Sequence, residues 1–171
     1  IRDEIEIKPG ITEKHANQYS YKTLKTKIVS IYRGTHPIKQ ATPGGSLAFE
    51  TELDNVLTKT DFLSGNIASI PGKLPEISNT IKIKYELFKE LVGEEETTKI
   101  EDLKLSEMIM LSINTTTVGK IIKIKNNEIE LSLRIPVVPI KGDSIGLARN
   151  IHNHWRLIGY GEILWLSKII E

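Results

Sequence analysis

A hairpin pattern around Asn126-Asn127 constrains the fold of this chain more than any other stretch. Apolar and charged residues alternate on both sides of the two asparagines, from Gly119 to Leu133. A two-residue turn there gives four facing pairs: Lys125 with Glu128, Ile124 with Ile129, Lys123 with Glu130, and Ile122 with Leu131. Asparagine tolerates the positive φ that such a turn requires, and each cross-strand pair contributes about 0.2–1 kcal/mol. Because a slip by one residue would put the lysines into the core, the pattern predicts a single register.

Further runs of alternating or β-branched residues cover most of the chain. Besides the hairpin, the predicted strands are 1–7, 23–33, 47–53, 66–70, 77–87, 108–113, 136–140, 144–151 and 154–164. Residues 85–91 also fit one or two helical turns, but the alternation before them favours a strand. The polar segments 12–20 and 34–40 are predicted loops. Short strands at this spacing are typical of an all-β barrel or sandwich.

The composition fits a globular protein and excludes several kinds of site. With 171 residues, the chain can form one large domain or two small ones. It contains no cysteine, which excludes disulfides and thiolate metal sites. No apolar run approaches the roughly 18 residues of a membrane span, and no signal peptide is visible, so we expect a cytoplasmic protein without a membrane partner. The chain starts with Ile1 inside a strand pattern, so we also expect a fragment.

The best candidate for a linker between two domains is a segment rich in proline and glycine, Pro71-Gly72-Lys73-Leu74-Pro75. Such segments commonly join domains, because few contacts cross them. We therefore expect one domain over residues 1–72 and a second over residues 73–171.

A serine hydrolase is one alternative function. The chain contains the pattern Gly-x-Ser-x-Gly at 142–146, with Ser144 as the nucleophile and His152 downstream. That motif acts where a strand turns sharply into a helix within a parallel sheet. The residues after Ser144 instead have the pattern of a strand, so a hairpin turn is the favoured interpretation.

A metal site is a second alternative. His152 and His154 would lie on one face of a strand, but a zinc site needs three or four ligands. The other histidines, His15 and His36, fall in the other predicted domain. We therefore expect no metal ion.

Guanine nucleotide binding is a third alternative. Residues 58–61, Thr-Lys-Thr-Asp, fit the signature that reads guanine. The phosphate loop Gly-x-x-x-x-Gly-Lys-Ser/Thr is missing, since neither Gly72-Lys73 nor Gly119-Lys120 has the required glycine before it. We expect this chain to bind no GTP by itself.

A nucleic-acid surface, if present, must be local, because Lys plus Arg numbers 23 and Asp plus Glu numbers 22. Candidate basic residues on predicted strands are Lys22, Lys25, Lys27, Arg33, Lys82, Lys84, Lys120, Lys123 and Lys125. The alternative to a nucleic-acid surface is that these residues simply form a solvated face. Lys123 and Lys125 already have partners in the predicted hairpin. Binding through such residues would depend on salt and be indifferent to base sequence.

A tight turn, Pro43-Gly44-Gly45, precedes the strand of residues 47–53, and Leu57-Thr58-Lys59 and Gly65 follow. This stretch resembles the second domain of the gamma subunit of archaeal and eukaryotic translation initiation factor 2. Four later blocks resemble its third domain: residues 108–119, 134–137, 142–149 and 154–161. The most specific block is the last, His-Trp-Arg-Leu-Ile-Gly-Tyr-Gly. The resemblance covers about residues 1 to 165.

The resemblance implies an all-β fold with two antiparallel β-barrels of the translation-factor type in tandem. Residues 1–72 would be an N-terminally truncated domain two and residues 73–171 domain three. In the whole GTP-bound heterotrimer, this family carries methionylated initiator tRNA to the small ribosomal subunit. GTP and Mg would belong to an absent GTPase domain, which also carries the beta subunit, while domain two docks the alpha subunit. This chain would itself be no enzyme and hold no cofactor.

By position, two strands resemble the walls of the pocket for the methionyl-adenosine end of the tRNA. The residues that the resemblance places there are Ile31, Arg33, Gly44, Gly45, Leu47, Phe49 and Glu50. Arg33 would meet the terminal phosphate or ribose, and the backbone at the two glycines would approach the aminoacyl ester. Ile31 and Leu47 or Phe49 would contact adenine or methionine. The same three apolar residues also fit a plain barrel core.

Four positions depart from the family pattern. This chain has Glu50 where the family usually has glycine, Asn55 where it has proline, Asn114 where it has glycine, and Tyr160 where it has tryptophan. If Glu50 faces the pocket, it adds bulk and negative charge near the tRNA end. A related translational GTPase, such as the selenocysteine-specific or an elongator-tRNA factor, is the alternative within the class, and the block at 154–161 argues against it.

Overall fold

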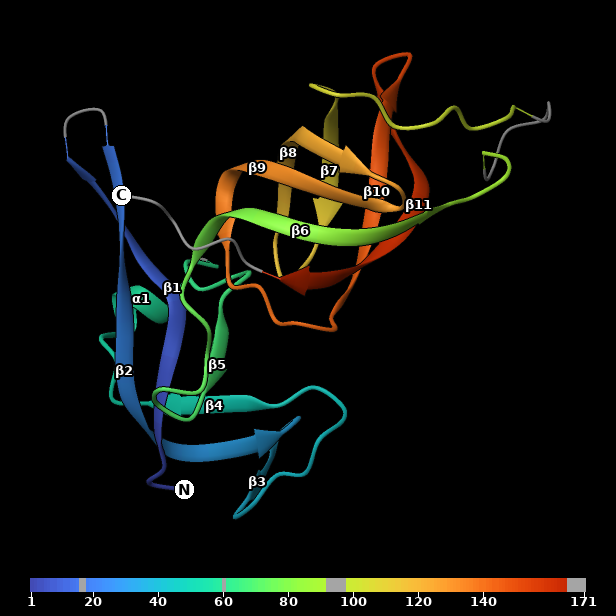
Figure 1. The fold of residues 1–171 in the computed structure, drawn as a ribbon. Helices are drawn as coiled ribbons and strands as arrows, with labels where there is room; N and C mark the ends of the chain where they lie inside the picture. Colours follow the sequence, from blue (N-terminus) through green and yellow to red (C-terminus); the bar gives the residue numbers. More distant parts are fainter. Residues whose placement is uncertain (16–17, 60, 92–97, 166–171) are drawn as a thin grey trace. The chain divides into compact units, whose positions relative to one another are not determined.

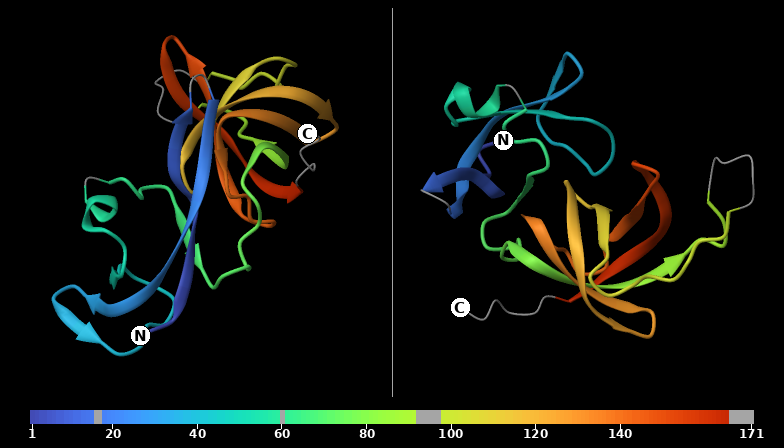
Figure 2. Two further views of the ribbon diagram at one scale, coloured as in Figure 1. Left: turned by 90° about the vertical axis from the view of Figure 1, so that its left-hand side faces the viewer. Right: turned by 90° about the horizontal axis from the view of Figure 1, so that it is seen from above.

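The chain forms two compact units in the structure, a computed structural model that describes residues 1–15, 18–59, 61–91 and 98–165. Unit 1 comprises Ile1–Leu74 and unit 2 comprises Pro75–Glu171 (Figures 1 and 2). The division falls two residues after the boundary expected at residue 72. Almost all regular structure is β, which confirms the predicted fold class. No helix in the described part of the chain is long and apolar enough to cross a membrane.

Unit 1 is a curled, five-stranded antiparallel sheet with the strand order β3-β2-β1-β5, and β4 pairs with β2. Its elements are β1 (Glu4–His15), β2 (Gln18–Arg33), β3 (His36–Ile38), β4 (Ala48–Thr51), the one-turn helix α1 (Asn55–Thr58) and β5 (Ile67–Ser69). Asp54 caps α1, since its carboxylate accepts a hydrogen bond from the Val56 backbone N–H at 2.9 Å. Among the described strands the sheet stays open, because β4 pairs only with β2 and β5 only with β1.

The loop predicted for residues 12–20 is wrong, because β1 runs to His15 and β2 starts at Gln18. The two strands form a long hairpin with paired residues from Glu4–Lys27 to His15–Gln18. Among the described strands, none pairs with the outer part of this hairpin, and most of its residues are polar. Sequence periodicity signals a strand only when one face is buried. The predicted loop over residues 34–40 likewise contains β3, a strand of three residues.

A bulge interrupts the β1–β2 hairpin between Ile7 and Ile11, where the Lys8–Pro9 peptide bond is cis. Gly10 lies in this bulge with φ +87°, and a Cβ added to it would lie 2.0 Å from the Lys22 carbonyl oxygen. Only glycine fits this backbone conformation and this close approach. The Gly10 N–H donates to Asn66 Oδ1 at 2.7 Å, which ties the bulge to the residue before β5.

Unit 2 is a closed six-stranded barrel in the order β10-β11-β6-β9-β8-β7. Its strands are β6 (Ser78–Leu87), β7 (Met108–Ser112), β8 (Thr116–Lys125), β9 (Glu128–Val137), β10 (Ser144–Ile151) and β11 (His154–Trp165). Inward-facing residues from every strand fill the core, among them the fully buried Ile81, Ile109, Ile121, Leu131, Leu147 and Ile158. Of the segment 85–91, for which the pattern favours a strand over a helix, residues 85–87 belong to β6 and the rest is neither a helix nor a regular strand.

The hairpin at Asn126-Asn127 forms as predicted near its turn. Lys125 pairs with Glu128, Ile124 with Ile129, and Lys123 with Glu130. The fourth predicted pair is wrong, because a bulge between Ile121 and Lys123 places Ile121 opposite Leu131. Ile121 is therefore buried, while Ile122 is 49% exposed. A bulge adds one residue to one strand, which an alternation pattern with isoleucine at both positions does not reveal.

Glu6 holds the segment through which the chain leaves unit 1. Its side chain is buried, and its Oε1 accepts a hydrogen bond from the Leu74 N–H at 3.3 Å. Hydrogen bonding from the Gly72 backbone, more than any other contact, lowers the pKa of this carboxyl, and the Leu74 N–H adds to the effect. Burial works in the opposite direction.

We expect Glu6→Gln to weaken unit 1 at neutral pH and to matter less in acid. The pKa of Glu6 in the folded chain is lower than its ordinary value of about 4.5. The carboxylate therefore stabilises the fold above pH 4.5, and that contribution disappears as the pH falls through the folded pKa. Urea unfolding of both proteins between pH 3 and pH 7 measures the difference. Glu52→Gln, at an exposed carboxylate of the same unit, is the control. A difference independent of pH would show that the charge of Glu6 has no part in it.

Candidate functional site

The register of β2 brings Ile31 and Phe49 together. Ile31 lies opposite Phe49 of β4 on one edge and opposite Ile38 of β3 on the other. Directly opposed residues of antiparallel strands share a face of the sheet. Ile31 is only 5% exposed, whereas Phe49 is 49% exposed. Ile31 is therefore a core residue of unit 1, and Phe49 is the aromatic surface that this pair offers to a ligand.

Arg33 is the last residue of β2. It follows Ile31 by two residues, so the two side chains lie on the same face of the strand. It pairs with His36 across the tight turn to β3 and is exposed. A guanidinium at the end of a sheet, close to solvent, is well suited to contact a phosphate.

Gly44 and Gly45 lie in the exposed connection from β3 to β4, with φ of +111° and +77°. A Cβ added at either position would meet no atom within 4 Å. The backbone conformation, rather than crowding, therefore requires glycine here. Leu47, half-buried, follows just before β4. The turn thus presents bare backbone to solvent.

Glu50 lies on the opposite face of β4 from Phe49, because successive strand residues point to opposite faces. It pairs with Ser30 of β2, whose hydroxyl donates to the Glu50 carboxylate. The concern that Glu50 adds charge beside Ile31 and Phe49 is thus reduced, since its carboxylate lies across the sheet from them.

Phe49 also lines an open groove of about 850 Å³ in unit 1. Apolar residues from four strands and the turn after β5 form most of it: Ile5, Ile28, Phe49, Ala68, Ile70 and Pro71. Asp3 and Glu4 add negative charge. Of the seven residues predicted for the site, Phe49 alone lines this groove. Pairing of β1 with β5 brings the groove residues together, and no local sequence pattern indicates that pairing.

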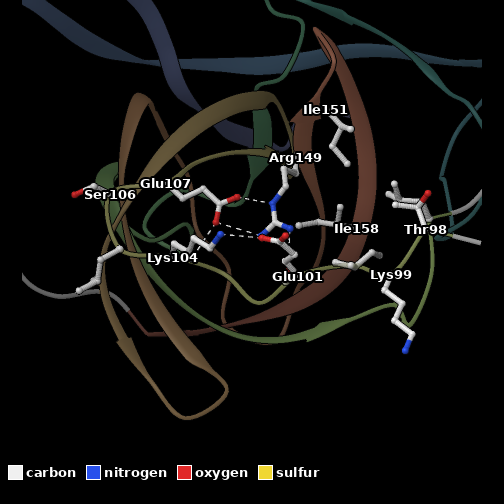
Figure 3. A pocket seen from close by; sticks show the side chains of 12 residues that line it. Thr98, Lys99, Glu101, Lys104, Ser106, Glu107, Arg149, Ile151 and Ile158 are labelled. Atoms are coloured by element: carbon white, nitrogen blue, oxygen red, sulfur yellow. Dashed lines mark hydrogen bonds and ion pairs between the residues drawn. The ribbon is translucent and has the colours of Figure 1, made fainter.

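A second pocket, of about 550 Å³, lies in unit 2 around Arg149 (Figure 3). The Arg149 guanidinium forms an ion pair with Glu107, and both side chains are less than a fifth exposed. It also donates to the carbonyl oxygens of Glu101 at 2.9 Å and Asp102 at 3.2 Å. The Glu107 carboxylate in turn accepts from the Lys104 N–H at 2.9 Å. These contacts fasten the segment before β7 to the barrel, and the hydrogen-bonding capacity of Arg149 is largely used within the fold.

The geometry argues against the hydrolase alternative. Ser144 begins β10, which pairs with β7 and β11 in antiparallel fashion, and a strand rather than a helix follows the serine. His152 lies in the turn at the far end of the same hairpin, about 26 Å away along an extended strand. The two side chains are too far apart for a proton transfer between them.

The remaining alternatives from the sequence concern a metal ion, a guanine nucleotide and a nucleic acid. In the described part of the chain, no group of three or more His, Asp or Glu residues could hold a metal ion. The Thr-Lys-Thr-Asp segment includes Thr60, which lies outside the described residues. Two of the five candidate lysines of unit 2 form ion pairs on the barrel wall, Lys82 with Glu128 at 2.6 Å and Lys123 with Glu130 at 3.4 Å. These two ion pairs reduce the positive charge that the wall could offer to a nucleic acid.

Comparisons with known proteins agree on one family. The family profile described as "Initiation factor eIF2 gamma, C terminal" matches residues 79–163. Translation initiation factor 2 subunit gamma of Methanococcus vannielii is 43% identical over 165 residues, which cover 96% of this chain and 40% of that protein. The protein of the same description from Methanocaldococcus jannaschii is 41% identical over 164 residues, and that from Pyrococcus abyssi is 38% identical over 164. Each covers 95% of this chain and 40% of the relative.

These matches, together with the closed barrel and the open sheet, place the chain in the class of translation initiation factors. Within that class the chain belongs to the gamma-subunit family of initiation factor 2. It spans about 40% of the length of the curated relatives that it matches.

Proposed function

We propose that this chain is the part of an initiation factor 2 gamma subunit that binds the end of methionylated initiator tRNA and docks the alpha subunit. The whole GTP-bound heterotrimer would deliver that tRNA to the small ribosomal subunit in the cytoplasm. The observation that carries the proposal is the match to gamma subunits over 96% of the chain. The exposed Phe49, the exposed Arg33 and the bare glycine turn support it as features suited to an aminoacyl-adenosine ligand.

In this proposal the chemistry of GTP lies outside these 171 residues. The sequence lacks a phosphate loop, and α1, with four residues, is too short to provide an anion site. A GTPase domain of the whole protein would hold GTP and Mg and contact the beta subunit. This chain would act by binding alone, without catalysis of its own.

The resemblance to the gamma subunit suggests a role for each residue of the site. Arg33 would bind the terminal phosphate or ribose, and the backbone of Gly44 and Gly45 would pack against the aminoacyl ester. Phe49, with Leu47, would contact the methionine side chain or adenine. Ile31 would support Phe49 from the core rather than touch the ligand, because it is only 5% exposed.

We expect Arg33→Ala to weaken the binding of methionyl initiator tRNA by the whole, GTP-loaded factor about tenfold or more. A hydrogen bond to a charged group contributes about 1.5–3 kcal/mol, which corresponds to a factor of about 10 to 150. Arg134→Ala, at an exposed arginine of unit 2, is the control for a general loss of positive charge. Protection of the aminoacyl ester from hydrolysis measures the affinity. Equal affinities of the wild type and Arg33→Ala would remove Arg33 from the site.

A further inference from the structure

A two-residue turn joins β2 to β3 and brings Arg33 and His36 together. The two residues lie directly opposite each other at the end of the hairpin. Gly34, the first residue of the turn, has φ +61°, whereas Thr35 has no positive φ, the combination found in type II′ hairpin turns. Such a turn fixes the register, and opposed Cβ atoms are about 4.5–5.5 Å apart. The hairpin therefore holds a guanidinium next to an imidazole.

The face of the sheet that carries this pair also carries apolar residues of the proposed tRNA site. Arg33 and His36 each lie two residues from the opposed pair Ile31 and Ile38, so all four share one face. Phe49 of β4 pairs with Ile31 from the other edge of β2 and belongs to the same face (Figure 1). Ile31 is buried and Ile38 is half-buried, whereas the other three are exposed. An aromatic ring and two cationic groups thus share an aliphatic floor.

No carboxylate neutralises the pair of Arg33 and His36. Residues 30–49, which include all of β3 and the glycine turn, contain no Asp or Glu. The next residue, Glu50, lies on the opposite face, where its carboxylate accepts from the Ser30 hydroxyl. Among the described residues, neither Arg33 nor His36 forms an ion pair or a side-chain hydrogen bond. The N–H donors of both side chains are therefore available to an anion.

We propose that His36 binds phosphate together with Arg33 and is a further ligand-binding residue of the tRNA site. The arginine fork can bind two phosphate oxygens with parallel hydrogen bonds. An imidazole donates at least one more hydrogen bond, whether or not it is protonated. Cationic donors without a carboxylate nearby suit a charged phosphate better than neutral ribose hydroxyls. Of the two partners considered for Arg33, the geometry therefore favours the phosphate.

The spacing on this face fits one nucleotide. Residues two apart on a strand are about 6.6 Å apart, so Phe49, which pairs with Ile31, lies one such step from the pair of Arg33 and His36. A nucleotide spans a comparable distance between its base and its 5′ phosphate. The base would stack on Phe49 while the phosphate contacts Arg33 and His36. That this nucleotide is the terminal adenosine of the initiator tRNA rests on the proposed function, whereas phosphate binding by the hairpin does not.

The first test titrates the 171-residue chain with adenosine 5′-monophosphate and, in parallel, with adenosine, and follows backbone amide shifts by NMR. We expect saturable shifts at Gly34 and Thr35 with the nucleotide and far smaller ones with the nucleoside, which lacks the phosphate. His36→Ala should weaken nucleotide binding about tenfold, as expected for the loss of one hydrogen bond to a charged group. His36→Gln, which keeps an N–H donor, should recover part of that loss. His154→Ala, at an exposed histidine of unit 2, is the matched control.

The second test uses the whole, GTP-loaded factor and methionyl initiator tRNA. His36→Ala should weaken tRNA binding about tenfold in the wild-type background. The same substitution should have a smaller effect when Arg33→Ala is already present, because the two side chains share one phosphate. The amide shifts of the remaining residues verify that each variant of the 171-residue chain is folded.

Three results would overturn the proposal. The first is a hairpin in the folded wild type that responds equally to the nucleotide and the nucleoside, or to neither. The second is equal nucleotide affinity of the wild type and His36→Ala. The third is a tRNA affinity that falls in Arg33→Ala and stays unchanged in His36→Ala.

The two tests separate this proposal from the proposed function. Adenosine 5′-monophosphate carries no methionine and no tRNA body, so a failure of the NMR test leaves the tRNA experiment on Arg33→Ala to decide the proposed function by itself. Conversely, nucleotide binding that depends on His36, combined with a whole factor that does not bind the tRNA, would refute the proposed function and leave the phosphate site in place.

Discussion

Replacement of Gly10 by alanine is expected to cost about 2–5 kcal/mol of the free energy of unfolding of unit 1. Two effects add. The residue has φ +87°, a conformation that costs an L-amino acid about 1–2 kcal/mol. The new Cβ would also lie 2.0 Å from the Lys22 carbonyl oxygen, so one backbone must move away from the other. Such a shift would break the pairing of β1 with β2 beside the bulge that contains Gly10.

Gly34→Ala is the matched control for this experiment. Gly34 also has a positive φ, +61°, but an added Cβ would meet no atom within 4 Å. The control therefore carries only the conformational cost, and the difference between the two variants measures the steric overlap. Amide hydrogen exchange followed by mass spectrometry reports on β1 and β2 directly. Equal losses of protection in the two variants would mean that the backbone at Gly10 relaxes without cost.

Arg149→Ala is expected to destabilise unit 2 by about 2–4 kcal/mol. Removal of one partner of a buried ion pair typically costs about 3–5 kcal/mol, because the other charge stays behind without compensation. We expect a somewhat smaller cost here because both side chains remain partly exposed to water, Arg149 by 16% and Glu107 by 18%. The substitution also removes the donors to the Glu101 and Asp102 carbonyl oxygens, so the segment before β7 loses its attachment.

Tryptophan fluorescence during urea unfolding isolates this effect, since both tryptophans of the chain, Trp155 and Trp165, belong to unit 2. Arg156→Ala, a substitution in the strand beside Arg149, controls for the loss of one positive charge. If Glu107 is the main partner, Glu107→Gln together with Arg149→Ala should cost less than the sum of the two single substitutions. Strict additivity would show that the carbonyl contacts, rather than the ion pair, hold the segment.

The sequence predicts those parts of the fold in which burial imposes alternation. The hairpin at Asn126-Asn127 forms in the expected register near its turn because charge pairing and burial agree there. The same reasoning fails at Ile121 and Ile122, where either isoleucine could face the core and a bulge selects Ile121. It also fails for residues 12–20, where most residues are polar and no buried face imposes an apolar alternation.

The candidate site shows a similar limit. Resemblance indicated the two strands, and the pairing of Ile31 with Phe49 follows once β2 and β4 are known to be neighbours. The difference between a buried Ile31 and a half-exposed Phe49 depends on which strands cover each position, and no local pattern contains that information. The same holds for Glu6, whose buried carboxylate holds a backbone segment 68 residues away.

The strand order of the barrel in unit 2 leaves β6 without its neighbouring strands for part of the time during synthesis. β6 pairs with β9 on one edge and β11 on the other, and about 40 residues separate the end of β6 from the start of β9. At roughly 5–20 residues per second, both edges of this isoleucine-containing strand stay open for about 2–8 s. Charged residues, lysine above all, discourage intermolecular pairing at open strand edges. We therefore expect Lys82 and Lys84 to discourage such pairing in the nascent chain, before Lys82 forms its ion pair with Glu128 in the finished barrel.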